Sequence, residues 1–339
     1  MTTAGESPVG VAVVGAGSMG GQHVRAYQGA GAEVVAICDV DAARAEALAG
    51  SIGARAYTDV DSMLDEAHPA AVSICTPPAQ HVAPALAAAE CGVGLLIEKP
   101  LANALAPARE IADAVHRHGV VCMIGFCHRF HEPVLQIKER LEAGEIGRPV
   151  LFRNRFAYEF EGVENTWFSD PAVAGGGTLM DTSVHSLDLY RFLIGDIDRV
   201  AAELDTVTPG LSVEDNSVLL VNGPTRVPGI IEASWTTPAG DSELIIFGTE
   251  GNLGVDYGQG DFGVAFIETP QAGRRMLDRS GVNRFVTEIR HFLDAVRGGQ
   301  DTRPNVDDGL RTLEAIDAAY LSVGQSRPSP SGSGINTNS

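Results

Sequence analysis

The chain has 339 residues, of which 44% are hydrophobic, and a formal net charge of -20. This length exceeds the usual size of a single hydrophobic core and predicts two domains. The acidic balance, without clustered Lys and Arg, argues against nucleic acid and anionic membrane surfaces as partners, because proteins bind both through basic patches.

Cysteine usage and the N-terminus indicate the compartment. The five cysteines are scattered, form no Cys-x-x-Cys pair, and several lie in or beside apolar runs where a thiol simply packs. The first residues, MTTAGESPVG, contain neither a basic nor an apolar signal region, and no apolar run is long enough to span a bilayer. We expect a soluble cytoplasmic protein with reduced cysteines and no metal site.

Short apolar runs alternate with helical patterns through the first third of the chain. The apolar runs are VGVAVVG, EVVAICD, AVSICTP, GLLIEKP and VVCMIGF, and helical patterns begin near Met19 and pass through AARAEALAG and APALAAAEC. The alternation predicts an α/β fold with a doubly wound parallel sheet, which binds ligands beyond the carboxyl ends of its strands. We predict that this Rossmann domain spans residues 1–127.

The pattern changes after Phe126. In VLFRNRFAYEF, residues 150–160, an aromatic face (Phe152, Phe156, Tyr158, Phe160) alternates with a charged face (Arg153, Arg155, Glu159). That alternation is typical of a half-buried strand. Strand-like runs follow at SVLLV, GIIEASW, ELIIFG and GVAFIE, with helical patterns at 283–297 and 306–323. We predict an α+β domain with a mainly antiparallel, open sheet over residues 128–325, and a disordered tail at 326–339.

The first predicted strand leads directly into GAGSMG, residues 15–20. Gly15, Gly17 and Gly20, which flank Ser18 and Met19, have the GxGxxG spacing of a dinucleotide-binding turn. The first glycine allows the tight turn, the second lets the backbone approach a pyrophosphate, and the third lets helix and strand pack closely. The turn lies between a predicted strand and a predicted helix, as this function requires.

The second predicted strand ends in Asp39. A carboxylate at this point can bond both hydroxyls of an adenosine ribose. It would repel a 2′-phosphate, and Val40 follows it rather than Arg or Lys, so the sequence favours NAD over NADP. The structural alternative is a glycine-rich turn in which Asp39 caps the next helix.

A second dense stretch is AGGGTLMDTSVHSLDLYRFLIGD, residues 174–196. After its glycines the pattern is helical, which would place Asp181, His185 and Asp188 on one helix face. A carboxylate one turn from an imidazole can orient it and stabilise its protonated form, as a general base near neutral pH requires. The alternative is a surface contact or a satisfied polar pair.

The strand-like run LLIEKPL, residues 95–101, ends in charged residues. The alternating pattern places Glu98 and Lys99 at a carboxyl edge of the nucleotide-binding sheet. Pro100 would stiffen the turn that holds Lys99, and a cis Lys99–Pro100 bond is one way to aim the lysine.

The chain resembles the Gfo/Idh/MocA family, whose members include glucose-fructose oxidoreductase and inositol dehydrogenase. The resemblance rests on GAGSMG, TPPAQH followed by ECGVGLLIEKP, GFCHRF, WFSDPAVAGGGTLMDTSVHSLD and FGTEGNLGV. It covers nearly the whole chain outside the termini, and EKP together with GGGxLxDxxxH is far more specific than the glycine motif alone.

This resemblance implies that Lys99, Asp181 and His185 form the catalytic group and contact substrate. His185 would accept the hydroxyl proton as hydride leaves the same carbon for nicotinamide, and would return it in the reverse reaction. Lys99 would stabilise the developing charge on the oxygen, and Asp181 would hold substrate and histidine. A plain surface ion pair is the alternative for Lys99.

Further residues are implied to line the cofactor. Thr76, Pro77 and His81 match the family's loop after the fourth strand, which lies along the cofactor, although His81 could equally cap the helix that begins near Pro84. Glu98 would shape its own loop and meet the cofactor, and Lys99 is also implied to contact the cofactor.

Several residues are candidates for substrate binding. Arg129 would bind substrate hydroxyls or form an interdomain salt bridge, and Trp167 would line the sugar pocket or pack in the core. Arg153 and Arg155 would face substrate or a partner subunit. Thr182 departs from the family pattern, because many relatives have glycine there, and this departure bears on the substrate more than on the chemistry.

The leading interpretation is an NAD-dependent dehydrogenase or reductase acting on a secondary alcohol of a sugar, inositol or similar polyol. One alternative keeps NAD tightly bound and uses it transiently, for oxidoreduction between two sugars or for redox-assisted glycoside cleavage. Another is a regulator that senses NAD and sugar without turnover. The resemblance also implies a homodimer or homotetramer formed through the open face of the C-terminal sheet.

Overall fold

The computed structural model describes residues 8–258, 263–278, 281–298 and 302–324. They form two compact units: the chain up to Glu139 with Asp278–Arg311, and Arg140–Leu277 with the residues from Thr312. The segment Asp278–Arg311 therefore packs with the first unit. The sequence pattern had placed it in the second predicted domain, residues 128–325. The domain boundaries as functional divisions stay a prediction, and the tail 326–339 lies outside the described residues.

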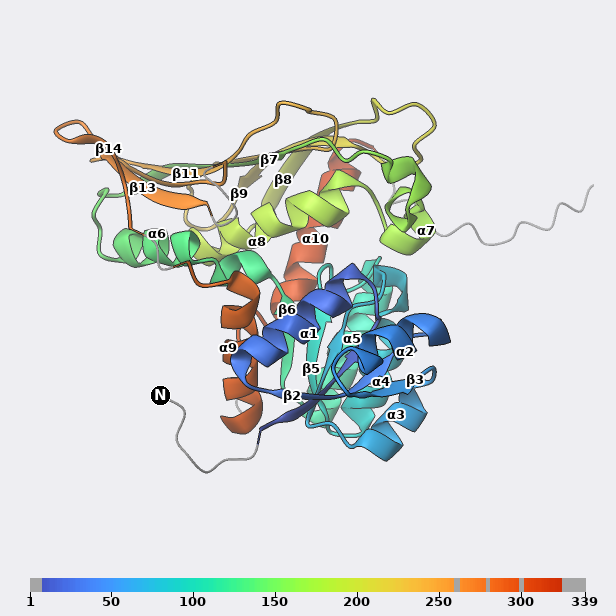
Figure 1. Ribbon diagram of the computed structural model, residues 1–339. Coiled ribbons are helices and arrows are strands. Elements are labelled where there is room, and N and C mark those ends of the chain that lie inside the picture. Colours follow the sequence, from blue (N-terminus) through green and yellow to red (C-terminus); the bar gives the residue numbers. More distant parts are fainter. Residues whose placement is uncertain (1–7, 259–262, 279–280, 299–301, 325–339) are drawn as a thin grey trace, which may run out of the picture. The chain divides into compact units, whose positions relative to one another are not determined.

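The first unit contains the predicted doubly wound parallel sheet (Figure 1). Its strands follow the order β3-β2-β1-β4-β5-β6, and all neighbouring strands pair in parallel. The strands are β1 (Gly10–Val14), β2 (Glu33–Cys38), β3 (Arg55–Tyr57), β4 (Ala71–Ile74), β5 (Gly94–Glu98) and β6 (Cys122–Gly125). The order reverses between β1 and β4, where sheets of this type bind dinucleotides.

Helices connect and cover these strands. They are α1 (Ser18–Ala30), α2 (Ala42–Gly50), α3 (Val60–Ala67), α4 (Val82–Glu90), α5 (Leu105–His118), α6 (Glu132–Glu142) and α9 (Arg284–Gly298), with 3-10 turns η1 (Pro78–Gln80) and η2 (Cys127–Phe130). Helix α1 ends at Gly31, whose φ of 80° is the left-handed conformation that glycine adopts without strain.

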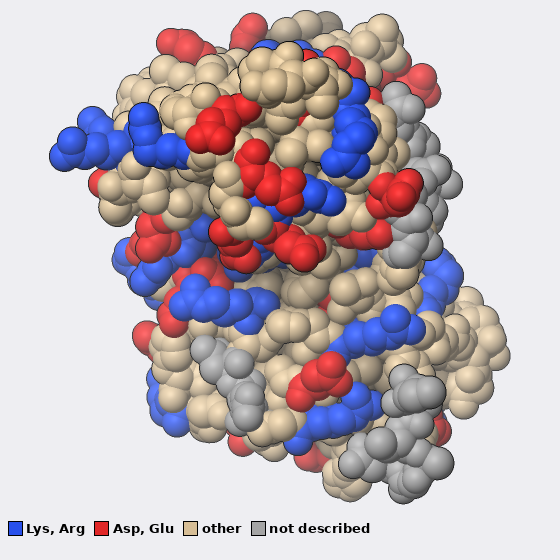
Figure 2. All heavy atoms as spheres, turned by 90° about the vertical axis from the view of Figure 1, so that its left-hand side faces the viewer, with Lys and Arg blue, Asp and Glu red and all other residues tan. Residues whose placement is uncertain are grey.

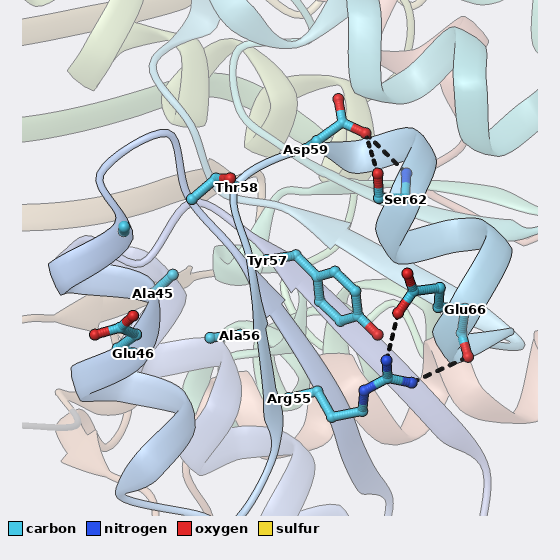
Figure 3. Close-up of a pocket in the computed structure, with 10 residues that line it drawn as sticks. Ala45, Glu46, Arg55, Ala56, Tyr57, Thr58, Asp59, Ser62 and Glu66 are labelled. Atoms are coloured by element: carbon cyan, nitrogen blue, oxygen red, sulfur yellow. Dashed lines mark hydrogen bonds and ion pairs between the residues drawn. The ribbon is translucent and has the colours of Figure 1, made fainter.

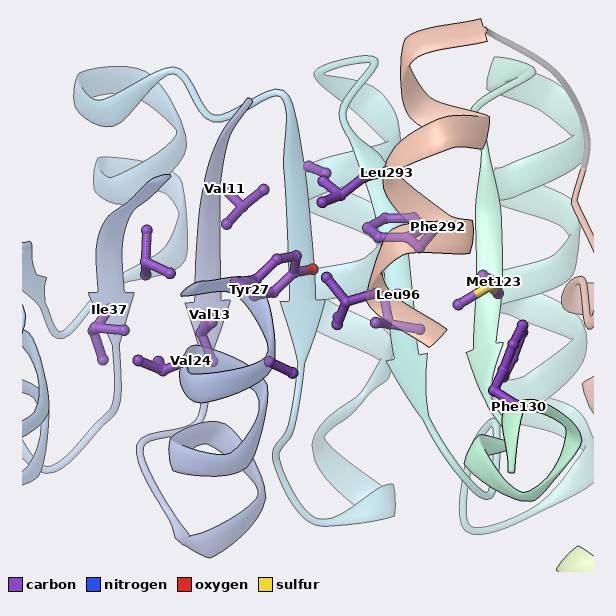
Figure 4. Packing of buried hydrophobic residues seen from close by; sticks show 14 of the residues in the cluster. Val11, Val13, Val24, Tyr27, Ile37, Leu96, Met123, Phe130, Phe292 and Leu293 are labelled. Atoms are coloured by element: carbon purple, nitrogen blue, oxygen red, sulfur yellow. The ribbon is translucent and has the colours of Figure 1, made fainter. Parts of the chain in front are cut away.

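The core of the first unit forms where α1 and α9 pack on one face of the sheet (Figure 4). Tyr27 of α1 and Phe292 of α9 are fully buried, together with Val11, Val13 and Leu96 of the strands. Full burial of each large apolar side chain contributes about 1.5–3 kcal/mol. Strands buried on both faces also explain why β1 and β5 read as continuous apolar runs rather than alternating ones.

The second unit contains the predicted mainly antiparallel sheet. Its strands follow the order β14-β13-β12-β11-β7-β10-β9-β8, in which β7 and β10 pair in parallel and the other neighbours pair antiparallel. The strands are β7 (Pro149–Ala157), β8 (Arg199–Asp205), β9 (Asn216–Asn222), β10 (Gly229–Ser234), β11 (Ser242–Gly248), β12 (Asn252–Asp256), β13 (Val264–Thr269) and β14 (Gly273–Met276).

Helical elements of different lengths accompany this sheet. They are η3 (Val163–Asn165), η4 (Trp167–Ser169), α7 (Pro171–Ala174), the π-helical turn η5 (Leu179–Ser183), α8 (Val184–Leu193) and α10 (Val306–Ser322), whose first turns group with the first unit.

Strand β7 shows the predicted alternation. Phe152 and Phe156 are buried with Asn154 between them, and Arg153 and Arg155 lie on the other, partly exposed face. The ring of Phe152 packs edge-on against Tyr190 of α8, with centroids 5.4 Å apart, so α8 covers the buried face. Tyr158, predicted on the same face, lies beyond the strand and is exposed.

The other face of this sheet leaves apolar side chains exposed. On β9, Val218 and Leu220 keep 45% and 59% of their surface exposed, alternating with buried neighbours. Ion pairs share this face, with Nε of Arg153 lying 2.8 Å from Oε2 of Glu232.

The surface and the helices complete the description of the fold. On the side of the molecule shown in Figure 2, basic and acidic side chains are interspersed, and neither sign forms a continuous patch. Among the helices of the described residues, none has both the length and the apolar character needed to cross a bilayer.

Candidate active site

The glycine turn between β1 and α1 has the shape that a dinucleotide requires. Gly15 has a φ of 97°, and a Cβ on Gly20 would lie 1.9 Å from the carbonyl oxygen of Gly15. A Cβ on Gly17 would meet nothing within 4 Å, so this glycine borders open space. Gly17 precedes the first turn of α1, where Ser18 is exposed and Met19 half-buried. A helix start beside open space fits a pyrophosphate, because the first backbone N–H groups of a helix have no partner within it.

Asp39 joins this turn to the end of β2. Its Oδ2 accepts a hydrogen bond from the N–H of Ala16 at 2.7 Å, and its Oδ1 accepts one from the N–H of Asp41 at 2.9 Å. The cap of α2 is Asp41, whose Oδ1 accepts from Ala43 and Arg44. The structural alternative for Asp39, a helix cap, is therefore wrong.

The loop after β4 lies against the same turn. A Cβ on Gly15 would come within 2.9 Å of the backbone N of Thr76, and Oγ1 of Thr76 is buried without a hydrogen-bond partner. Pro77 precedes η1, the single turn that begins at Pro78. A buried hydroxyl without a partner beside the glycine turn fits a site that a polar ligand completes.

His81 fastens that loop to the segment after β5. Its Nε2 lies 2.8 Å from the carbonyl oxygen of Thr76, and its Nδ1 lies 3.2 Å from that of Leu101. Burial lowers the pKa of His81, although these backbone contacts act in the opposite direction. The residue occupies the N-cap position of α4, as the capping alternative predicted, but its side chain makes no cap bond and contacts the two loops instead.

Lys99 follows β5 directly and is half-buried. Its backbone N–H donates to Oε2 of Glu98 at 3.2 Å, and the Lys99–Pro100 peptide bond is cis. Arg129, in η2, is buried with Nη1 3.7 Å from Oδ2 of Asp308. This ion pair lies within the first unit rather than between domains.

In the second unit, Asp181 and His185 lie on either side of a change in helix type. Asp181 is in the π-helical turn η5 and His185 in the first turn of α8. The spacing argument assumed one continuous α-helix through both residues. The π turn contains Asp181 and ends at Ser183, so the α-helical register of His185 does not extend back to Asp181. Asp188 is buried. Single π turns inside helices occur frequently at functional sites.

Glu214, which the sequence analysis did not single out, anchors the glycine run before this turn. Its Oε1 accepts hydrogen bonds from the N–H groups of Gly177 and Leu179 and from the hydroxyl of Tyr320, at 2.9–3.0 Å. Burial raises the pKa of Glu214, and the three donors oppose that rise. A Cβ on Gly177 would lie 1.7 Å from the carbonyl oxygen of Glu214, so this position requires glycine.

Thr182 connects Asp181 to an aromatic cluster. Its Oγ1 accepts from Nε1 of Trp235 at 3.0 Å and donates to Oδ2 of Asp181 at 3.3 Å. Trp235 packs with Phe168, on which Trp167 is stacked with ring centroids 3.8 Å apart. Trp167 is 39% exposed, so it borders solvent rather than filling the core.

A pocket of about 370 Å³ lies apart from these residues, at the edge strand β3 (Figure 3). Its walls come from α2, β3 and α3, and the guanidinium of Arg55 in it is paired with Glu66. Glu46 and Asp59 add further negative charge. Neither the glycine turn nor Lys99 lines this pocket, so we do not assign the chemistry to it.

Comparison with known proteins agrees with this geometry. The profile of the oxidoreductase family with an NAD-binding Rossmann fold matches residues 9–126, and that of the Gfo/Idh/MocA C-terminal domain matches residues 134–254. The chain belongs to the Gfo/Idh/MocA family. As a member of this family it is an NAD-dependent oxidoreductase, and its Rossmann unit binds NAD.

Individual relatives of this Gfo/Idh/MocA chain match along nearly their full length. It is 28% identical to D-apiose dehydrogenase of Paraburkholderia graminis, over 93% of this chain and 88% of that protein. It is 27% identical to scyllo-inositol 2-dehydrogenase (NAD(+)) of Bacillus subtilis, over 95% and 96%. The structure of levoglucosan dehydrogenase with NADH and levoglucosan superposes with a TM-score of 0.88 at 25% identity, covering 94% of this chain and 98% of that one.

The glycine turn yields a paired prediction. Gly17→Ala should unfold at the wild-type temperature but bind NADH about tenfold more weakly, because a methyl group would occupy space that the pyrophosphate needs. Gly20→Ala should lose at least about 3 kcal/mol of stability through the clash with Gly15. Thermal unfolding without cofactor and calorimetric titration with NADH measure both effects. Wild-type NADH affinity in Gly17→Ala would contradict the assignment.

Asp39 can be tested by charge alone. Asp39→Asn keeps an oxygen for the Ala16 N–H but no longer repels a 2′-phosphate, so the preference for NADH over NADPH should fall by about tenfold. Asp41→Asn removes the same charge two residues away and serves as the control, with an unchanged preference. Equal preferences in both variants and wild type would remove Asp39 from cofactor selection.

Proposed function

We propose that this chain is an NAD-dependent dehydrogenase or reductase that acts on a secondary alcohol of a sugar, inositol or related polyol. The names of its relatives give D-apiose, scyllo-inositol and levoglucosan as their substrates, all of them polyhydroxylated. One observation carries the proposal. Lys99 follows the carboxyl end of β5, and the glycine turn follows the carboxyl end of β1, so both lie at the same edge of the parallel sheet.

Lys99 would hydrogen-bond the oxygen of the reacting carbon. A lysine ammonium at that oxygen stabilises the negative charge that develops on it in the transition state. Glu98, beside it, bonds the Lys99 backbone and shapes the loop. Bound NAD supplies the group that takes up or returns the hydride.

His185 would exchange the proton of the same hydroxyl, taking it in oxidation and returning it in reduction. Asp181 would hold the substrate and orient the histidine. Its Oδ2 accepts from Thr182, whose hydroxyl is in turn fixed by Trp235, so one carboxylate oxygen already has a set direction. Arg129 and Trp167 remain candidates for contacts with further substrate hydroxyls.

Two alternatives to this function make different predictions. An enzyme that retains NAD would copurify with it and produce no net NADH with its substrate. A sensor without turnover would need no Lys99, Asp181 and His185 together, and the presence of all three favours the enzyme.

Substitution of the proposed catalytic residues tests this function. Lys99→Ala and His185→Ala should each lower kcat by about 100-fold or more and leave NADH affinity close to wild type, because neither belongs to the glycine turn. Lys138, the other of the two lysines of the chain, provides the control, and Lys138→Ala should retain wild-type kcat. Near wild-type turnover in both catalytic variants would reject the assignment.

We also propose that the exposed apolar face of the second unit's sheet joins subunits into a dimer or tetramer. Leu220→Glu would place a charge on that face and should lower the mass measured by light scattering. Leu321→Glu alters a leucine of α10 that is 70% exposed and should leave the mass unchanged. A monomeric wild-type protein would exclude the interface.

A further inference from the structure

A histidine inside the first unit connects the cofactor-binding helix to the strand that carries Lys99. His23 lies on α1, one turn beyond Gly20, and is fully buried. Its Nε2 is 2.8 Å from Oε1 of Glu98, and its Nδ1 is 3.0 Å from Oγ of Ser73 on β4. The ring of His23 thus contacts both β4 and β5 of the parallel sheet.

Both oxygens of Glu98 are engaged in this arrangement. Oε1 faces His23, and Oε2 accepts the backbone N–H of Lys99. The neighbouring position on β6 is Gly125, where a Cβ would lie 2.8 Å from Oε1 of Glu98. Because position 125 is glycine, the Glu98 carboxylate has space to reach His23. Glu98 also directly precedes Lys99 in the chain.

The charge state of His23 fits an ion pair. Burial alone would lower its pKa, but contacts with Cys75 and Glu98 raise the pKa of His23 well above the usual value. The ring nitrogens of His23 lie at hydrogen-bond distance from Glu98 and Ser73, so the ring bridges these two side chains. Burial raises the pKa of the Cys75 thiol, which lies beside this ring.

We propose that His23 is a positioning residue for Lys99: its ring fixes Glu98, and Glu98 fixes the backbone of Lys99 relative to the helix that binds the cofactor. Nothing in this role requires His23 to contact substrate or NAD. The inference rests on the proposed function of Lys99, and it adds that a residue of the glycine-turn helix controls where that lysine stands.

The variants follow from the two contacts of the ring. His23→Gln can still donate one hydrogen bond toward Glu98, whereas His23→Leu donates none. We expect kcat to fall by about 10- to 100-fold in His23→Leu and less in His23→Gln, with NADH affinity within about threefold of wild type, because displacement of a catalytic group costs up to about 100-fold. Tyr27→Phe is the control: its hydroxyl bonds Ser73, 2.7 Å away, without reaching Glu98.

A second readout observes Lys99 directly and needs neither substrate nor cofactor. The chain contains two lysines, so reductive ¹³C-methylation gives two lysine side-chain signals, and Lys138→Arg assigns them. In His23→Gln the Lys99 signal should move and the Lys138 signal should not, and Tyr27→Phe should move neither.

Unchanged kcat together with an unmoved Lys99 signal in folded His23→Gln would overturn the proposal, whether or not His23→Leu folds. A loss of thermal stability in His23→Gln with the Lys99 signal unmoved would also overturn it, because that combination describes a merely structural histidine. Failure of the underlying function is distinguishable: Lys99→Ala would then retain wild-type turnover, whatever His23 does.

Discussion

The close contact between helix α1 and the end of β1 is the constraint on which the first unit depends. Only glycine fits at position 20, because a Cβ there would lie 1.9 Å from the carbonyl oxygen of Gly15. The same contact that presents the helix start to a pyrophosphate brings His23, three residues further on, within 2.8 Å of Glu98. The proposed cofactor turn and the proposed placement of Lys99 thus share one packing contact.

Each unit places a buried carboxylate beside a proposed catalytic residue. Glu98 adjoins Lys99, and Glu214 holds Gly177 and Leu179 at the start of the π turn that contains Asp181. Buried polar groups of this kind need hydrogen-bond partners, and leaving one unsatisfied costs about 1–3 kcal/mol. In this chain each carboxylate fixes the backbone of a short segment, Lys99 in one unit and Gly177 to Leu179 in the other.

Local sequence patterns predicted the strands of the first unit except β3 and the strands of the second unit except β8, β12 and β14. The missed strands are short or weakly apolar; β14, for example, is GRRM. The glycine turn was predictable because it is a short-range pattern in which Gly15 and Gly20 meet local steric needs. The π turn was not, since its residues fit an α-helical period. Neither was the contact of His23 with Glu98, which lies 75 positions away and depends on the folded sheet.

The central claim is that hydride passes between a polyol carbon and NAD on this chain. Inositols, aldoses, sugar phosphates and nucleotide sugars that carry deuterium on their secondary carbinol carbons can be incubated with the protein and NAD, and the cofactor can be analysed by mass spectrometry. The account predicts that one of these classes transfers deuterium to the nicotinamide ring, and that His185→Ala abolishes the transfer. Binding of NADH without deuterium transfer from any class would contradict it.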